Sequence, residues 1–117
     1  MSQPPLAERI LGVSDTVRYV ALYRSGELSL HQRPDLEGAS SAESDRYEEL
    51  LVNPTLLTLT RQRGEIDCGG LEYVLIRYGS FFQLVHPLRD GHASIAIEAA
   101  GSPFPTVDAL TSLLRSS

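Results

Sequence analysis

Three groups of residues in this chain have the types that catalytic or metal sites use. Cys68 and His86 are a thiol and an imidazole, from which a nucleophile and its base can be built. His86 and His92 stand on either side of one predicted hairpin, where two imidazoles can approach each other as metal ligands. Glu48 and Glu49 are neighbouring carboxylates, the groups that acid–base catalysis often uses.

None of these groups comes with the further residues that its chemistry needs. No third residue is evident to orient the cysteine and histidine, and a lone cysteine is more often a small buried apolar residue. The histidines lack further ligands at a recognisable spacing, and Glu48-Glu49 stands in a polar stretch typical of a solvated face. The glycines of the chain are not followed by the Lys-Ser/Thr of a phosphate-binding loop. We therefore expect no enzyme, no catalytic residue, no cofactor and no metal.

Composition indicates one globular domain over residues 1–117 and limits the classes of molecule that it is expected to bind. With 42% hydrophobic residues the chain has the composition of a folded protein, and its one cysteine excludes an internal disulfide and suits a reducing compartment. The net charge is −5, and the ten arginines are scattered without any lysine, so we expect no nucleic acid as partner. No leader is evident at the start, and no segment approaches the ~20 apolar residues of a membrane span. We expect a cytoplasmic protein that does not bind membranes.

The first third of the chain alternates short structured runs with turns. The spacing of the apolar residues over 6–13 predicts an opening helix. β-branched and aromatic residues over 17–24 and alternating leucines over 27–32 predict two strands, joined by a tight turn at Ser25-Gly26. Pro, Gly and Ser interrupt any period over 33–44, which favours a surface loop.

Two short helices are expected next. Apolar residues at helical spacing indicate helices over 45–52 and 54–63. Asn53 is a good N-cap and Pro54 suits a first helical turn. The two segments can be separate helices or one kinked helix. Because a proline within a continuous helix removes a backbone hydrogen bond, we favour a break here.

The remaining sequence predicts three strands and a closing helix. The strands cover 71–78, 81–86 and 92–98, and Asp90-Gly91 is a strong hairpin signal between the last two. The first of them is apolar on both alternating faces, as expected of a strand covered on both sides. Leucines and a valine at helical spacing over 107–114 predict the final helix. The expected order is helix, hairpin, helix, three-stranded meander, helix.

This order and the residues that carry it resemble the roadblock family of dynein light chains and bacterial GTPase partners. The resemblance runs from about Leu6 to Leu114 and rests on the hairpin over 18–30, the helix after it, the meander over 71–98 and the terminal helix. It implies an α+β fold of the profilin-like and roadblock-like kind, a five-stranded antiparallel sheet with helices on both faces in the order α-β-β-α-β-β-β-α. It also implies a homodimer that acts as a platform for a small Ras-like GTPase or a related protein.

Family members commonly dimerise through the middle strand and the long helix before it. The positions that the resemblance assigns to the dimer or partner interface are Leu56, Leu59, Arg63, Leu71, Tyr73 and Leu75. The alternative for the last three is an ordinary core position beneath a helix. An arginine acting in trans on the GTPase stays open, with Arg24, Arg61, Arg63 and Arg89 as candidates.

Two other functions stay open. Profilin-like folds can enclose small molecules, and a pocket lined by Tyr19, Tyr73 and Tyr78 would favour a ligand-sensing domain. Dense packing of Phe81, Phe82 and Leu84 would argue against it. An enzyme built on the cysteine would need an exposed and unusually reactive thiol.

Overall fold

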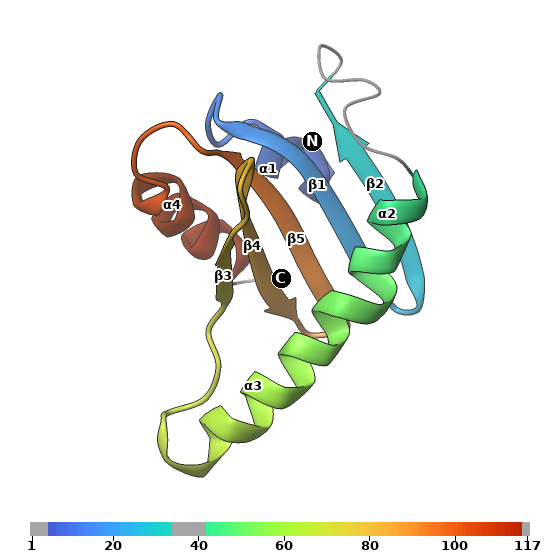
Figure 1. Cartoon of the computed structure of the whole chain (residues 1–117), viewed down its shortest axis with the longest axis vertical. Coiled ribbons are helices and arrows are strands. Elements are labelled where there is room, and N and C mark those ends of the chain that lie inside the picture. Colours follow the sequence, from blue (N-terminus) through green and yellow to red (C-terminus); the bar gives the residue numbers. More distant parts are fainter. Residues whose placement is uncertain (1–4, 34–41, 116–117) are drawn as a thin grey trace.

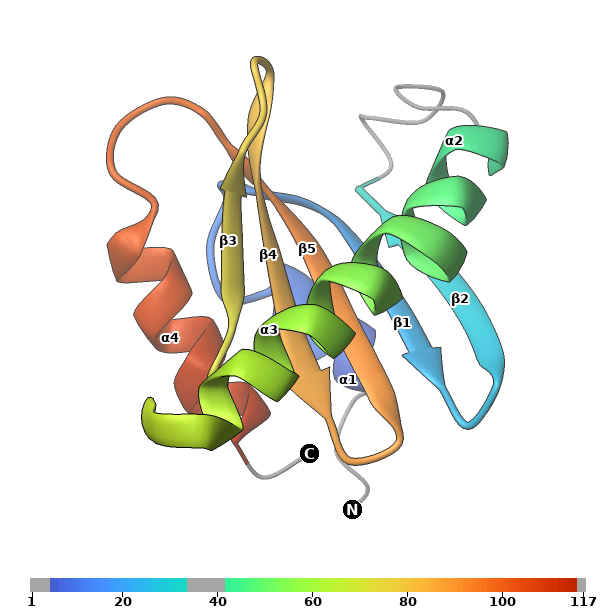
Figure 2. The same cartoon turned by 60° about the horizontal axis from the view of Figure 1, so that its bottom comes forward.

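The structure is a computed structural model that describes residues 5–33 and 42–115. Its core is an antiparallel sheet of five strands in the order β2-β1-β5-β4-β3, which confirms the predicted α+β fold. The helices cover both faces: α2 and α3 cross one face, and α1 and α4 lie on the other (Figures 1 and 2). The elements are α1 (Leu6–Leu11), β1 (Val17–Arg24), β2 (Glu27–Gln32), α2 (Ala42–Tyr47), the π-helical turn η2 (Glu48–Val52), α3 (Asn53–Asp67), β3 (Val74–Arg77), β4 (Phe81–Leu88), β5 (Gly91–Glu98) and α4 (Phe104–Leu114).

The first hairpin has the predicted strands and turn. β1 and β2 pair from Arg24 and Glu27 onward, which leaves Ser25-Gly26 as a two-residue loop. Ser25 has a φ of 53° and Gly26 a φ of 85°. Two successive residues of positive φ are what a hairpin turn of type I′ requires.

The second hairpin lies where it was predicted but turns on other residues. Leu88 pairs with Gly91, so the two-residue loop is Arg89 and Asp90, and Gly91 is already in β5. A Cβ atom on Gly91 would lie 1.7 Å from the carbonyl oxygen of Tyr23 in the neighbouring strand β1. Glycine is therefore needed at position 91 for the close approach of two backbones, which sequence alone does not distinguish from a turn.

The long helix does not break at Asn53-Pro54, so that prediction was wrong. The helical backbone runs through η2 into α3, and Asn53 lies inside it with φ −66° and ψ −43°. A π-helical turn ends at Val52, two residues before Pro54, and such wide turns accommodate a local interruption of the α-helical hydrogen bonds. Of the predicted 33–44 loop, residues 34–41 lie outside the described residues, and the helix has already begun at residue 42.

β3 is shorter than predicted and lies at the edge of the sheet. The strand extends over Val74–Arg77, where 71–78 was expected, and its residues are half-buried or exposed. The expectation that it would be covered on both faces was wrong, because Val74, Leu75 and Ile76 are only half-buried and Arg77 is exposed. The continuous apolar run at this point of the sequence therefore belongs to an edge strand whose outer side is paired with no other described strand.

The apolar core fills the face of the sheet that α1 and α4 cover. Side chains of β1, β4 and β5 that point to this face meet the apolar sides of both helices. Its fully or nearly fully buried members are Ala7, Ile10, Val17, Val20, Leu22, Leu84, Leu88, Ala93, Ile95, Ile97, Val107, Leu110 and Leu114. Burial of this apolar surface is the main stabilising contribution to the fold.

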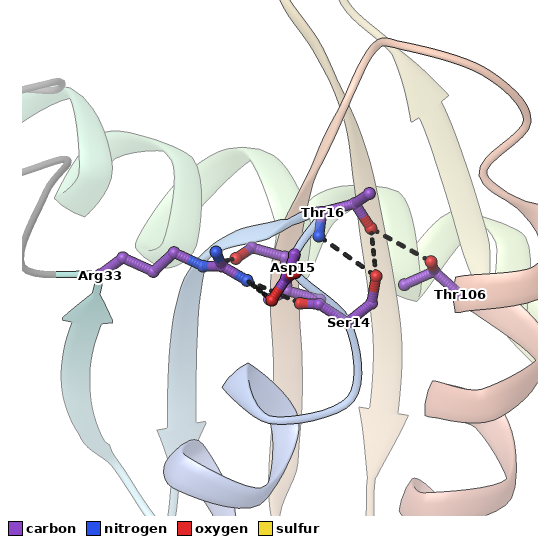
Figure 3. A network of polar contacts seen from close by, with 6 residues as sticks. Ser14, Asp15, Thr16, Arg33 and Thr106 are labelled. Carbon is purple, nitrogen blue, oxygen red and sulfur yellow. Dashed lines mark hydrogen bonds and ion pairs between the residues drawn. The ribbon is translucent and has the colours of Figure 1, made fainter.

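A polar cluster holds the start of β1 between the end of β2 and the start of α4 (Figure 3). Arg33 donates from Nε to the carbonyl oxygen of Val17 at 2.6 Å and from Nη2 to that of Ser14 at 2.7 Å. The hydroxyl oxygen of Thr16 lies 2.9 Å from that of Ser14 and 3.2 Å from that of Thr106. These bonds fix the connection from α1 to β1 on both sides.

The position of Gly91 gives a stability prediction. Gly91→Ala is expected to lower the free energy of unfolding by about 3 kcal/mol, because two backbones must separate to admit the methyl group. Gly79→Ala is the matched control, since a Cβ atom there meets nothing within 4 Å. Urea unfolding measures both, and equal effects of the two substitutions would contradict the proposed close approach.

Candidate functional site

A pocket of about 400 Å³ lies between the start of the long helix and the sheet. We call it the acidic pocket because three carboxylates, Asp45, Glu48 and Glu49, line it from α2 and η2. Strands β1, β4 and β5 provide its opposite wall. The other lining residues are Arg18, Tyr19, Gln32, Ser44, Tyr78, Gly79, Ser80, Phe81, Gln83 and Ala96.

A buried polar network joins the long helix to the sheet at this pocket. Glu49 is fully buried, and its Oε1 accepts a hydrogen bond from Nδ2 of Asn53 at 2.9 Å. Nε2 of His92, on β5, lies 2.8 Å from the same oxygen. Asn53 Nδ2 also lies 3.2 Å from Oγ of Ser94, to which Nε2 of Gln83 donates as well. Because polar groups lose much stability when buried unpaired, this network fixes how the helix sits on the sheet.

Two polar atoms of the pocket have no hydrogen-bond partner among the described residues. They are Oε2 of Glu49 and the hydroxyl oxygen of Tyr19, and both are fully buried. Both residues line the pocket. Buried polar atoms in folded proteins are nearly always hydrogen-bonded, so these two lack the partners that such atoms usually have.

Electrostatics in the acidic pocket disfavour any further negative charge. Burial raises the pKa of Glu48; the hydrogen bond from Tyr78, 3.0 Å long, opposes this rise, and the charges of Glu49 and Asp45 add to it. Burial and the bond to Glu48 raise the pKa of Tyr78 to about 12. Burial, together with the three carboxylates, also holds the pKa of Tyr19 well above its ordinary value. Ionisation of any of these groups therefore costs free energy in the folded chain.

The predicted interface residues of the helix lie on its outer side. Leu56 is half-buried, Leu59 is 60% exposed and Arg63 is exposed, where it pairs with Asp67 at 2.5 Å. Ile66, which the sequence analysis did not include, is 76% exposed. The spacing of these residues is three, four and three, so they share one face of α3.

The predicted interface residues around β3 lie elsewhere. Tyr73 and Leu75 are half-buried and pack against the apolar core, as the alternative interpretation expected. Leu71 is half-buried in the connection before the strand. The β3 residues that point to the α3 side are Val74 and Ile76, because neighbouring residues of a strand alternate between faces.

The candidate catalytic and metal residues are not brought together. Cys68 is exposed at the end of α3, which corrects the expectation of a buried thiol, and its Sγ lies 3.4 Å from Oδ1 of Asp67. His86 is buried and is paired with Ala93, whereas His92 is paired with Pro87, so the two imidazoles lie on opposite faces of the sheet. Within residues 5–33 and 42–115, no three His, Cys, Asp or Glu side chains are placed to hold a metal ion.

Sequence reasoning missed the most buried functional candidate. Glu48-Glu49 was expected on a solvated face, but Glu49 has no exposed surface and Glu48 is half-buried. The spacing of Glu49, Asn53 and Leu57 contained the signal, since residues four apart share one helix face and Leu57 is buried against the sheet.

Across the described residues, no helix has the length and apolar character needed to cross a membrane.

The raised pKa of Glu48 gives a pH prediction. The folded chain binds this proton more tightly than the unfolded chain, so its stability falls as the pH rises from 4.5 through the folded-state pKa. Glu48→Gln removes the titration, and its free energy of unfolding relative to the unsubstituted chain is expected to increase over that window. Urea unfolding at a series of pH values measures this difference. Glu72→Gln, at an exposed carboxylate outside the pocket, controls for the loss of one charge, and a pH-independent difference for Glu48→Gln would contradict the prediction.

Comparisons with known proteins provide no identification. No protein-family model matches the chain, and no curated protein matches it. The resemblance to the roadblock family therefore rests on the order of elements and on the residues that carry it. Two features of the molecule bear on its function: the acidic pocket, and the outer face of α3 with its exposed apolar residues.

Proposed function

We propose that the chain is a non-enzymatic, cytoplasmic scaffold or regulatory module that forms a homodimer and binds a partner protein, in the first place a small Ras-like GTPase. The observation that carries this proposal is the open apolar edge of β3 beside a helix with exposed apolar residues. The exposed thiol of Cys68 is compatible with a reducing compartment.

The two edges of the sheet differ in character. β2 carries polar residues at alternate positions, with Glu27 and Ser29 exposed. β3 instead presents three consecutive apolar residues over 74–76, and no described strand pairs with its outer side. Proteins usually protect edge strands with charge, proline or a covering element, because bare edges pair with other chains. The apolar edge of β3 is therefore suited to pair with another strand.

The chain runs directly from the end of α3 to this edge strand. A Cβ atom on Gly64 would lie 3.0 Å from the carbonyl carbon of Gly70, so the connection to β3 folds back against the helix. The amide of Gly70 donates to the carbonyl oxygen of Gly64 at 3.0 Å. Residues 71–73 then lead from this cap to the start of β3, and Leu59 and Ile66 are exposed on the last turns of the helix (Figure 1).

A second copy of the chain fits both features at once. Two β3 strands that pair antiparallel about a two-fold axis would extend the sheet from five strands to ten. The same axis would bring the two α3 helices together, so that Leu59 and Ile66 of one protomer face those of its partner. Stable interfaces bury about 800 Å² per partner, which a strand and a helix face together can supply.

The class of partner follows from the resemblance. Dimers of the roadblock family present a platform to small Ras-like GTPases, and this chain offers no phosphate-binding loop of its own. The chain is expected to bind such a GTPase in a defined ratio and to hydrolyse no GTP by itself. Titration calorimetry with a Ras-like GTPase of the same organism, in its GDP and GTP forms, measures the complex.

The dimer gives a direct prediction. Light scattering coupled to size exclusion is expected to give twice the chain mass of 12.8 kDa, and this mass should persist over a hundredfold dilution to low micromolar concentration. Leu59→Glu with Ile66→Glu places four like charges in the dimer seam and is expected to raise the dissociation constant at least about a hundredfold.

Phe104→Glu is the matched control for the dimer experiment. Phe104 is 53% exposed at the start of α4, which lies on the opposite face of the sheet, so its substitution adds a charge without touching the seam. A monomer of the unsubstituted chain at all concentrations would overturn the shared-sheet dimer. Equal weakening by Phe104→Glu would overturn the assignment of the seam to α3.

The acidic pocket supports a second candidate function, a small-ligand-sensing domain. Tyr19 and Tyr78, two of the three tyrosines expected in such a pocket, line it, whereas Tyr73 packs in the core on the other face. Phe81 lines the pocket instead of closing it. A volume of about 400 Å³ lies within the range of small-molecule sites.

A further inference from the structure

The charged lining of the acidic pocket is mostly of one sign. Three carboxylates, those of Asp45, Glu48 and Glu49, line it from the helix. The one lining cation among the described residues, Arg18, has its Nε 3.5 Å from Oε1 of Glu98 on the neighbouring strand. Arg18 is thus already shared with another carboxylate, and the charges of Glu48 and Glu49 favour a positive group in the pocket.

One carboxyl oxygen among the residues that line the pocket has no hydrogen-bond partner in the described part of the chain. Glu49 is fully buried, and although its Oε1 accepts two hydrogen bonds, its Oε2 has no partner among the described residues. A carboxyl oxygen accepts hydrogen bonds, so a donor in the pocket would supply the missing partner. The unpartnered hydroxyl group of Tyr19, which can both donate and accept, belongs to another residue that lines the same pocket.

The remaining lining is apolar and aromatic. Tyr19, Tyr78 and Phe81 present rings to the pocket, and Ala96 gives it a small apolar wall. The rings of Tyr78 and Phe81 lie in contact, with their centres 5.4 Å apart. Aromatic faces attract organic cations, and they also pack against the apolar body of a ligand, which a hydrated metal ion does not have.

We propose that the acidic pocket binds a small organic cation, with its ammonium or guanidinium group donating to Oε2 of Glu49 and its apolar body against Tyr19 and Phe81. This inference rests on the second candidate function, ligand binding at the pocket, and names the class of ligand. A positively charged hydrogen-bond donor pairs with the buried oxygen of Glu49 and offsets the negative charge of Glu48 and Glu49 at once. A neutral donor meets the first requirement alone, and an anion meets neither.

The first experiment compares three probes that share a phenylethyl group and differ in charge. They are 2-phenylethylammonium, 2-phenylethanol and 3-phenylpropionate, each titrated into the full chain and followed by amide NMR spectra. The ammonium probe is expected to bind at least about tenfold more tightly than the alcohol, and the carboxylate is expected not to bind. The shifted amides should centre on Glu48, Glu49, Gly79 and Ser80.

The second experiment removes single charges from the pocket. Glu49→Gln keeps the size and an acceptor oxygen, and it is expected to weaken ammonium binding at least about tenfold. Because Glu49 is buried and its substitution can disturb folding, Glu48→Gln at the half-buried neighbour provides a second variant with the same expected direction. Glu72→Gln is the control, since its exposed carboxylate pairs with Arg115 at 3.5 Å and does not line the pocket.

The outcomes separate the inference from the function on which it rests. If the alcohol binds as tightly as the ammonium probe, ligand binding at the pocket stands and the preference for a cation is overturned. If no probe shifts the pocket amides at millimolar concentration, both are overturned. Ammonium binding that Glu48→Gln weakens no more than Glu72→Gln would also overturn the inference. The homodimer is tested independently, by its mass.

Discussion

The central strand β5 is buried on both faces, and the rest of the structure depends on this constraint. Its side chains alternate between an apolar face of Ala93, Ile95 and Ile97 and a face that carries His92 and Ser94. The apolar face needs volume and shape alone, and α1 and α4 supply them. The polar face needs hydrogen-bond partners at defined positions, and the long helix supplies them through Glu49 and Asn53.

This division gives the two layers of the molecule different properties. An apolar contact tolerates small shifts, whereas a buried carboxylate that accepts from Asn53 and His92 tolerates few. The network therefore holds the register of the long helix on the sheet. In this position the helix leaves the acidic pocket open at its start and turns Leu59 and Ile66 outward near its end.

The two proposed sites thus occupy opposite ends of one helix. At its start, η2 places Glu48 and Glu49 over the sheet, beside the turn that follows β3. At its end, α3 returns through Gly64 and Gly70 to the start of the same strand. A short edge strand therefore lies between the pocket and the proposed dimer seam.

Much of the fold was predictable from local sequence. The strands over 17–24 and 27–32 and the turn at Ser25-Gly26 were predicted with the observed bounds, since alternation and turn residues are properties of neighbouring positions. The closing helix and the three-stranded meander were also present, with shifted ends. Leu56, Leu59 and Arg63 were predicted to be interface residues and share the outer face of α3, although their role in an interface stays a prediction.

Contacts between distant segments decided the remainder. Gly91 carries the hairpin signal, but the backbone of Tyr23 makes glycine necessary there. Asn53-Pro54 is a helix start by its residue types, yet Asn53 is drawn into the helix by partners on η2 and β5. Glu49 has the sequence context of a solvated carboxylate and is fully buried. The sequence by itself determined the elements, because they depend on neighbouring residues. The tertiary structure alone decided burial, edges and the pocket, because these depend on residues thirty or more positions apart.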